Sequence, residues 1–167
     1  MPEKVIIAMS GGVDSSVAAY LCCKAGFDCI GVTMKLFTND ALSLPREHSC
    51  CSLDDVEDAR SVAEQLGMPY HVFNFADRFE SCVINRFVHA YENGETPNPC
   101  IDCNRYLKFE KLYQRAQELG CTHVVTGHYA RIERAENGRF LLKKGLDPTK
   151  DQSYVLYCLT QQQLAHT

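Results

Sequence analysis

A glycine-rich turn with the sequence SGGVDSS, residues 10–16, joins an apolar stretch to a helix-like stretch near the start of the chain. A turn of this kind presents backbone N–H groups and a helix N-terminus, and both bind anions such as phosphate. Gly11 and Gly12 let the backbone approach a ligand closely, and the carboxylate of Asp14 suits a magnesium ion placed between it and the phosphates. The turn matches neither GxxxxGK[ST] nor GxGxxG. A double glycine alone also serves any tight turn, but the strand before it and the helix after it favour a phosphate site.

Two cysteines in a proline-containing stretch form a second candidate centre. Cys100 and Cys103 lie in TPNPCIDCN, residues 96–104, directly before a helix-like stretch. The N-terminus of a helix stabilises an anion and lowers the pKa of a nearby thiol, so Cys103 is a candidate nucleophile. The CxxC spacing also fits a zinc site if Cys50 and Cys51 supply the second pair, or an iron-sulfur cluster with three cysteine ligands. The residues alone leave these three uses open.

Composition limits the class of protein. The chain has 167 residues, of which 46% are hydrophobic and 23% charged, as is typical of one soluble globular domain. No apolar run is long enough to span a membrane, and the N-terminus lacks the pattern of a signal peptide, so we expect a cytoplasmic protein with no membrane partner. The ten cysteines should then be reduced. A net charge of -4 argues weakly against a nucleic-acid partner, but four basic residues within 104–115 leave a local basic patch open.

Strand-like and helix-like stretches alternate along the chain. Buried apolar runs predict strands at residues 4–9, 29–37, 70–75 and 123–127. Helical spacing predicts helices between Gly12 and Gly26, over 52–66 with Ser52 as N-cap, over 78–92, from Leu107 to Leu119 and after Thr160, with loops at 38–51 and 94–104. This order predicts an α/β fold, an open parallel sheet with helices on both faces.

Two details of this fold are also predicted. Val17, Ala18, Leu21 and Cys22 recur at helical spacing and should face the core from the first helix. Asn137-Gly138 separates two stretches of alternating polarity within 130–145 and predicts a β-hairpin appended to the sheet.

Five stretches resemble, in order, the family of tRNA-specific 2-thiouridylases, which modify the wobble uridine of tRNA. The first, SGGVDSS, is similar to the pyrophosphate loop of N-type ATP pyrophosphatases, which adenylate an oxygen atom and release pyrophosphate. The others are CCSLDDVEDARSVAEQLGMPYHVFNF, TPNPxxxCNRYLKF, TGHYARI and GLDPTKDQSYVLY. Together they extend from residue 6 to about residue 157, and five motifs in the right order are highly specific.

The resemblance implies an activity and a set of roles. The uracil C2 oxygen is adenylated by ATP with Mg²⁺, and sulfur then arrives from a cysteine persulfide supplied by a cysteine desulfurase or a sulfur-relay protein. Cys103 is the nucleophile and forms a disulfide bond with the persulfide-bearing cysteine, or Cys100 and Cys103 hold a [4Fe-4S] cluster or zinc. The ATP site comprises Ala8, Met9, Ser10, Gly11, Gly12, Val13, Asp14, Ser15, Met34 and Gly127, with Asp14 also a ligand of Mg²⁺. The residues that contact tRNA are Asn98, Pro99, Cys100, Lys150, Asp151 and Gln152.

Two features depart from the family. Many members have Asp where this chain has Cys100, so the acid–base role of that Asp does not transfer, and the same change creates the CxxC spacing. The persulfide cysteine of the family lies beyond the KDQSY segment, and no cysteine follows Cys158. We therefore expect residues 1–167 to be the N-terminal ATP pyrophosphatase domain of a longer protein, incomplete for catalysis alone. Another adenylating synthetase of the same loop family, or a non-catalytic nucleotide- or metal-binding module, stays open as an alternative.

Overall fold

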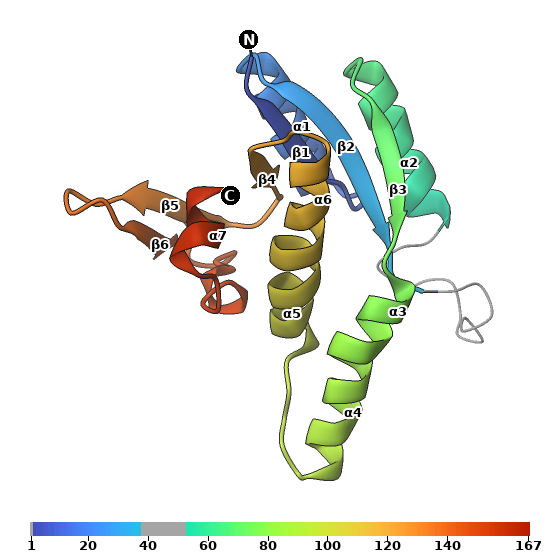
Figure 1. The fold of residues 1–167 in the computed structure, drawn as a ribbon, viewed down its shortest axis with the longest axis vertical. Helices are drawn as coiled ribbons and strands as arrows, with labels where there is room; N and C mark the ends of the chain where they lie inside the picture. The colour runs from blue at the N-terminus through green and yellow to red at the C-terminus, as the bar shows by residue number, and fades with distance from the viewer. Residues whose placement is uncertain (1, 38–52) are drawn as a thin grey trace.

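A four-stranded parallel sheet forms the centre of the protein in the computed structural model, which describes residues 2–37 and 53–167 (Figure 1). The strand order is β3-β2-β1-β4. The strands are β1 Lys4–Ala8, β2 Asp28–Lys35, β3 Tyr70–Asn74 and β4 His123–Val125. The chain thus moves outward from β1 to β3 and then returns to the other side of β1. Ligands of open parallel sheets bind at the carboxyl ends of strands where the order reverses, here beside β1 and β4.

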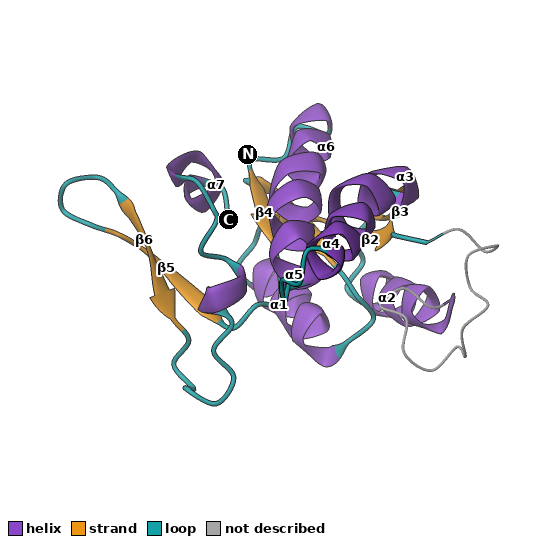
Figure 2. Cartoon of the chain, turned by 90° about the horizontal axis from the view of Figure 1, so that it is seen from below, coloured by secondary structure: helices purple, strands orange, loops and turns teal. Residues whose placement is uncertain are grey.

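Helices cover both faces of the sheet, and Figure 2 shows the strands between the two helical layers. On one face lie α1 Val13–Lys24 and α2 Leu53–Gln65. The other face is covered by two continuous helices, each with a wider π-helical segment inside it. The first consists of α3 Ala76–Phe79, a π-helical segment Glu80–Ile84 and α4 Asn85–Glu92, and the second of α5 Pro99–Asp102, a π-helical segment Cys103–Lys111 and α6 Leu112–Glu118. The predicted α/β fold is confirmed.

The last part of the chain folds beside the sheet. It contains β5 Ala130–Arg134, β6 Phe140–Lys144, a 3-10 turn Ser153–Val155 and α7 Gln161–Ala165. The hairpin is present, but it is a separate two-stranded antiparallel sheet, so its predicted attachment to the parallel sheet is wrong. The backbone N–H of Val124 in β4 instead donates to the carbonyl of His166 at 2.9 Å. This edge therefore already has a backbone partner.

The core has two halves, because side chains of a strand point alternately to opposite faces. Val5 and Ile7 of β1 pack with Ala19, Ala59 and other residues under α1 and α2. The residue between them, Ile6, packs on the opposite face with Leu107, Leu112 and Phe109 of the long helix. The carboxyl end of β1 is thereby held between both helical layers.

The predicted core face of the first helix is wrong for Val17 and Leu21, whereas Cys22 packs against the core as expected. In α1 the buried residues are Ser15 and Ala19, whereas Val17 and Leu21 are 48% and 56% exposed. Small side chains at the buried positions let the helix lie close to β1, and larger apolar side chains would not fit there. The glycine turn at the start of α1 is consequently drawn tightly onto the end of the strand.

The predicted loop at 94–104 is too long. A helix begins at Pro99, because the side chain of Asn98 accepts a hydrogen bond from the N–H of Cys100 and proline is tolerated at the first helical position. The predicted loop at 38–51, the N-cap at Ser52 and the cysteines Cys50 and Cys51 lie outside the described residues. Within the described part of the chain, no helix has the length and apolar character needed to cross a bilayer.

Candidate nucleotide site

A cavity of about 170 Å³ opens at the carboxyl ends of β1 and β4, where the strand order reverses. It is lined by Ala8, Met9, Ser10, Asp14, Ser15, Met34, Lys108, Thr126, Gly127, His128 and Gln152. Eight of these eleven residues are among the predicted site residues, seven from the ATP set and Gln152 from the tRNA set. Gly11, Gly12 and Val13 complete the turn between these walls without lining the cavity. Segments far apart in the sequence thus meet at one site.

The turn from Ser10 to Ser15 is held by its own hydroxyl groups. Ser15, which is buried, accepts a hydrogen bond from the N–H of Ser10 at 3.2 Å and donates one to the carbonyl of Gly12 at 2.9 Å. Gly12 is the N-cap of α1, and no side chain caps this helix. The first N–H groups of a helix have no intrahelical acceptor. The start of α1 is therefore suited to bind an anion, which would fill the role of the missing cap.

Two glycines bring the turn into close contact with its surroundings. A Cβ atom on Gly127 would lie 2.8 Å from the backbone carbonyl carbon of Asp14 and 2.8 Å from the nitrogen of Ser15. Gly11 has a φ angle of +79°, and a Cβ atom there would lie 2.6 Å from the carbonyl oxygen of Asp55 in α2. Only glycine fits at both positions, because the obstructing atoms belong to backbone.

A buried hydroxyl pair fixes the end of β1 from behind. Thr33 of β2, which is 1% exposed, donates to the carbonyl of Met9 at 2.8 Å. The hydroxyl of Tyr70 in β3 donates to the oxygen of Thr33 at 2.6 Å. Buried hydrogen bonds of this kind hold a backbone in one geometry, because an unpaired buried oxygen is costly.

The segments that carry Tyr129 and Lys150 close the cavity on the side of Asp14. The hydroxyl of Tyr129 donates to Asp14 Oδ1 at 2.7 Å, and this hydrogen bond raises the pKa of Tyr129. The Lys150 ammonium group lies 5.2 Å from the centre of the Tyr129 ring. Gln152 binds the backbone of Tyr129 twice, through its side chain at 3.0 Å and its own N–H at 2.9 Å. Lys150 and Gln152 therefore lie beside the nucleotide cavity.

Asp151 has a structural role in the same segment. Its carboxylate accepts hydrogen bonds from the N–H of Gly145 at 2.8 Å and from the N–H and hydroxyl of Ser153 at 3.2 and 2.9 Å. The Gly145 N–H, followed by the Ser153 groups, holds the pKa of Asp151 below its usual range. With both oxygens engaged inside the loop, Asp151 shapes the segment that presents its two neighbours.

Three residues of the cavity wall had not been predicted as site residues. Lys108 comes from the π-helical segment Cys103–Lys111, and Thr126 and His128 flank Gly127. Burial, and secondarily the charge of Lys108, lowers the pKa of His128 to about 4, so this imidazole is neutral at pH 7. The distance between Thr126 Oγ1 and His128 Nδ1 is 2.8 Å. His128 and Thr126 lie within the quoted TGHYARI motif, and Lys108 lies within the basic stretch 104–115. Membership of these two stretches was the sequence signal that could have identified the three residues.

Cys103 lies on the same long helix as Lys108, five residues before it, and is half-buried against the core. It does not line the cavity, and neither do Asn98, Pro99 and Cys100. The helix begins at Pro99, so the first turn contains Cys100, whereas Cys103 is one turn further in. The prediction of Cys103 next to a helix N-terminus is therefore wrong by about one turn, and the N-terminal position belongs to Cys100.

Neither a metal cluster nor a disulfide bond is formed by the cysteines that the structure describes. None of these eight cysteines is bonded to another of the eight. Within residues 2–37 and 53–167, no three His, Cys, Asp or Glu side chains come together in a way that could hold a metal ion. Cys100 and Cys103 thus have no third ligand there, and Cys50 and Cys51 lie outside this part. A disulfide bond among the described cysteines is likewise not supported.

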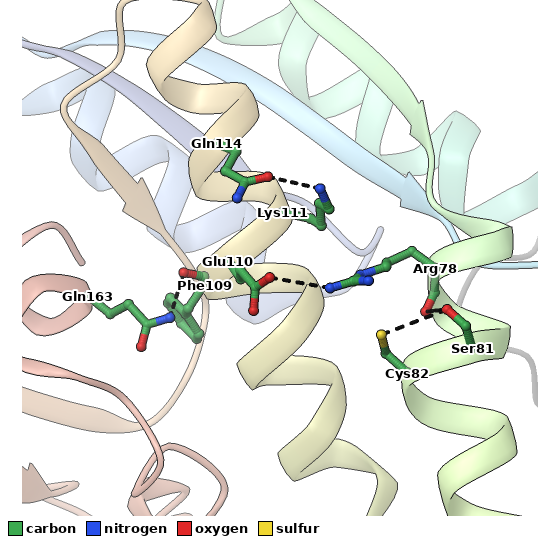
Figure 3. A network of polar contacts seen from close by, with 8 residues as sticks. All are labelled: Arg78, Ser81, Cys82, Phe109, Glu110, Lys111, Gln114 and Gln163. Atoms are coloured by element: carbon green, nitrogen blue, oxygen red, sulfur yellow. Dashed lines mark hydrogen bonds and ion pairs between the residues drawn. The ribbon is translucent and has the colours of Figure 1, made fainter.

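Polar contacts join the long helix to its neighbours (Figure 3). Arg78 of α3 pairs with Glu110 at 3.3 Å, and the side chain of Gln163 in α7 donates to the carbonyl of Phe109 at 2.9 Å. Asn104, which is 1% exposed, donates to the carbonyl of Val155 at 3.1 Å. These contacts hold the π-helical segment that carries both Cys103 and Lys108.

A larger cavity of about 390 Å³ lies between α3 and α6, away from the glycine turn. Its charged lining residues are Asp77, Arg78, Lys111, Arg115 and Glu118. Arg78 is paired with Glu110, and Arg115 with Glu118 at 2.6 Å. Arg78 and Arg115 are thus already paired, and no residue of the glycine turn lines this cavity. We therefore do not assign the functional site to it, although it is the larger of the two.

The sheet order, the two helical layers and the glycine turn at the reversal point define an α/β domain of the adenine nucleotide alpha hydrolase type. The chain belongs to the tRNA methyl transferase HUP domain family, whose sequence pattern matches residues 3–167. This finding confirms the family resemblance seen in the sequence.

Named relatives are similar over the whole chain. The tRNA-specific 2-thiouridylases MnmA of Clostridium acetobutylicum and Clostridioides difficile are each 55% identical to it, over 167 and 168 residues. These alignments cover 100% of this chain but 47% and 46% of the relatives, so the chain spans about half their length. A solved structure of a predicted subunit of tRNA methyltransferase from Methanocaldococcus jannaschii has a TM-score of 0.50 and 17% identity, and covers 89% of this chain and 61% of that chain. This likeness supports the fold alone.

Proposed function

We propose that this chain is the nucleotide-binding part of an enzyme that replaces the C2 oxygen of the wobble uridine of tRNA with sulfur. The observation that carries the proposal is the cavity beside β1 and β4, which gathers eight residues predicted for ATP or tRNA from four separate stretches of sequence. The relatives named as tRNA-specific 2-thiouridylases, at 55% identity over the whole chain, support the same substrate and reaction.

ATP binds with its phosphates on the turn Ser10–Ser15, where the N–H groups at the start of α1 are its first partners. The carboxylate of Asp14 fits a Mg²⁺ ion, since it is exposed and has one oxygen engaged by Tyr129 while the other is available. A single carboxylate together with phosphate oxygens and water is a usual ligand set for this ion. When bound, Mg²⁺ offsets the negative charge of the phosphates.

In the first step the uracil C2 oxygen attacks the α-phosphorus of ATP. A new O–P bond forms, the bond from the α-phosphorus to the bridging oxygen breaks, and pyrophosphate leaves with that electron pair. The base loses its N3 proton as the C2 oxygen becomes part of an adenylate leaving group, which makes C2 the electrophile of the next step. The protein contributes orientation and charge complementarity, and the dipole of α1 stabilises the departing anion.

In the second step a persulfide sulfur attacks C2, and AMP departs with the electrons of the C–O bond. Cys103 then attacks the sulfur of the persulfide-bearing cysteine. The S–S bond breaks, the base regains its N3 proton as a 2-thiouridine, and the two cysteines form a disulfide bond. A thiol reductant reopens this bond after each turnover, and a cysteine desulfurase or sulfur-relay protein reloads the persulfide.

The surface that meets tRNA extends from the cavity along the long helix. Lys150 and Gln152 lie at one end, beside Asp14 and Tyr129. Asn98, Pro99 and Cys100 begin the helix whose later turns reach the cavity. We assign contacts with the target base to these three residues. The steps above use Cys103 as a thiol. Within the described residues Cys100 and Cys103 have no third ligand for an iron-sulfur cluster or zinc, and Cys50 and Cys51 lie outside those residues.

The test measures pyrophosphate release and thiolation by the full-length protein. Wild-type protein should release pyrophosphate from ATP only with a tRNA that has uridine at the wobble position, and a tRNA with cytidine there is the control. Cys103→Ser should leave ATP binding intact and abolish thiolation, while Cys158→Ser should retain activity. Pyrophosphate release without any tRNA, or thiolation by Cys103→Ser at the wild-type rate, would contradict the proposal.

A further inference from the structure

We propose that the ammonium group of Lys108 binds the α-phosphate of the nucleotide and remains on it after the base has been adenylated. The inference rests on the proposed function, because it assigns a contact within the same ATP site. It concerns a residue of the long helix, on the face of the sheet opposite to α1, so the phosphates would be held from both helical layers.

Lys108 is the only lysine or arginine among the lining residues that the structure describes for this cavity. The glycine turn itself supplies no cation, and its one charged side chain is the carboxylate of Asp14. His128, whose pKa is affected by the charge of Lys108, is neutral at pH 7 because burial lowers that pKa to about 4. Among the described residues that line the cavity, Lys108 is therefore the cation that a polyphosphate can contact, while Lys150 lies beside the cavity with its ammonium group over the Tyr129 ring.

The ammonium group of Lys108 has no acceptor of its own. Lys108 is half-buried, yet within residues 2–37 and 53–167 no hydrogen bond or ion pair reaches its Nζ atom. Two other lysines have a partner: Lys111 donates to Gln114 at 3.0 Å, and Lys143 pairs with Glu133. A partly desolvated charge without a partner is unfavourable, and an anionic ligand removes that cost.

The position of Lys108 along its helix selects the α-phosphate. Lys108 follows Cys103 by five residues, which is roughly 6 to 8 Å along a helix axis. The pyrophosphate that leaves lies on the turn at the start of α1, and the base lies towards Cys103. The phosphorus that is attacked must lie between these two ends. Of the three phosphates, the α-phosphate is the one placed between the turn and the helix that carries Cys103.

Charge on this phosphate rises in the transition state, so the contact also serves the reaction. A hydrogen bond from an ammonium group to a phosphate oxygen is stronger than a neutral one, and its strength grows with the charge on the oxygen. Lys108 should consequently affect the rate of adenylation in addition to ATP affinity.

The test compares nucleotide affinities of the full-length protein with those of Lys108→Met and Lys108→Arg. Lys111→Met is the matched control, because Lys111 lies on the same helix but faces the other cavity. Dissociation constants for adenosine, AMP, ADP and ATP are measured by titration calorimetry with Mg²⁺. We expect Lys108→Met to weaken AMP, ADP and ATP by a similar factor of about 10 or more, to leave adenosine unchanged and to slow pyrophosphate release. Lys108→Arg should recover part of the loss, and Lys111→Met should match wild type.

Several results would overturn the inference. If Lys108→Met binds each of the four ligands as tightly as wild type does, Lys108 does not contact the nucleotide. If only the affinity for ATP falls, Lys108 contacts the γ-phosphate and not the α-phosphate. If Lys111→Met loses as much nucleotide affinity as Lys108→Met, the effect comes from the net charge of the protein and not from a contact of Lys108. If the wild-type protein itself binds no ATP, the proposed function fails together with the inference. If wild type and Lys108→Met bind ATP equally well, only the inference about Lys108 fails.

Discussion

The hydroxyl of Tyr129 donates a hydrogen bond to Asp14 Oδ1 at 2.7 Å, across the mouth of the nucleotide cavity. These residues are 115 positions apart in the sequence. The contact joins the glycine turn to the segment after β4. Within residues 2–37 and 53–167, no hydrogen bond or ion pair engages the second carboxylate oxygen of Asp14, which can therefore face a cation. The contact with Tyr129 therefore links the orientation of a metal-binding group to the segment that also carries Lys150 and Gln152.

Replacement of Tyr129 by Phe tests this link. The variant keeps the ring under Lys150 and loses only the hydroxyl group, so Asp14 is free to rotate. We expect the concentration of Mg²⁺ needed for half-maximal ATP binding to rise by roughly 3-fold to 10-fold. A titration of ATP affinity against Mg²⁺ measures the change, with Tyr154→Phe, an exposed tyrosine outside the cavity, as the control. Identical Mg²⁺ curves for Tyr129→Phe and wild type would refute the link.

A methyl group on Gly127 should force the turn and β4 apart. The Cβ atom of Gly127→Ala would lie 2.8 Å from two backbone atoms of α1, and backbone cannot rotate away as a side chain can. We expect the free energy of unfolding to fall by about 1 to 3 kcal/mol and ATP affinity to fall with it. Gly12→Ala is the structural control, because its φ angle is -81° and its nearest neighbour is Ser10 Oγ at 3.5 Å. Urea unfolding should rank Gly127→Ala well below Gly12→Ala, and equal stabilities would show that the contact is easily relieved.

Acid should destabilise the fold through His128. Its pKa is lowered from 6.5 to about 4, mainly by burial. Between these two values the unfolded chain binds a proton at this position and the folded chain does not, so the free energy of unfolding decreases as the pH falls from 6.5 to 4. The loss from this group amounts to at most about 3 kcal/mol.

Urea unfolding at a series of pH values measures this effect. His128→Gln cannot titrate, so its stability should change less between pH 6.5 and 4 than that of wild type, while the difference between the two proteins should be constant above pH 7. His71→Gln serves as a control, since His71 is an exposed histidine of β3 away from the cavity. If wild type and His128→Gln follow parallel curves throughout, His128 is not buried in its neutral form.

Gln163 should stabilise the long helix from a distance in sequence. Its side chain donates to the carbonyl of Phe109 at 2.9 Å, inside the π-helical segment. Gln163→Ala leaves that carbonyl without this donor and also removes the Gln163 oxygen that accepts from the N–H of Thr160 at 2.9 Å, so it should lower the free energy of unfolding by about 1 to 2 kcal/mol. Gln162→Ala removes an exposed glutamine from the same helix and should change stability by less than about 0.5 kcal/mol. Thermal unfolding of both variants measures the difference. Equal unfolding midpoints for Gln163→Ala and Gln162→Ala would show that the Gln163 side chain does not stabilise the fold.

The buried side-chain amide of Asn104 should contribute more to the free energy of unfolding than the side chain of Gln163 does. Asn104 is 1% exposed and donates to the carbonyl of Val155 at 3.1 Å, so Asn104→Ala leaves a buried carbonyl unpaired and a small cavity. We expect a loss of about 1 to 3 kcal/mol in the free energy of unfolding. Urea unfolding of Asn104→Ala measures this loss. Arg105→Ala is the control, because Arg105 is an exposed neighbour on the same helix and its replacement should change the free energy of unfolding little. A loss no larger than that of Arg105→Ala would show that the Val155 carbonyl finds another partner.

Much of the architecture follows from local sequence. The apolar run around Ile6 can be buried only in the middle of a sheet, and Gly11, with its φ angle of +79°, forms a turn that most residues adopt at a cost. These properties belong to single segments and to their immediate neighbours, so the strands, the glycine turn and the order of helices were predictable. Eight residues of the cavity wall were predictable for the same reason, because they lie in recognisable motifs.

Other features depended on contacts between distant segments. Helical spacing in α1 placed Val17 and Leu21 in the core, but only the packing of Ser15 and Ala19 against β1 decides which face is buried. The start of the long helix at Pro99 was hidden by its two prolines, although Asn98 can cap it. In each case the sequence pattern is compatible with more than one arrangement, and the neighbouring element selects one.

The sequence by itself determined that a phosphate-binding turn lies at the end of a buried strand in an α/β fold, because turn geometry and strand burial are properties of short stretches. Only the tertiary structure decided that Lys108 and His128 share the cavity with that turn, and that Cys103 lies one helical turn further from the helix start than expected. The physical reason is that the strand order returns to β1 after β3, which brings residues about one hundred positions apart to the same end of the sheet.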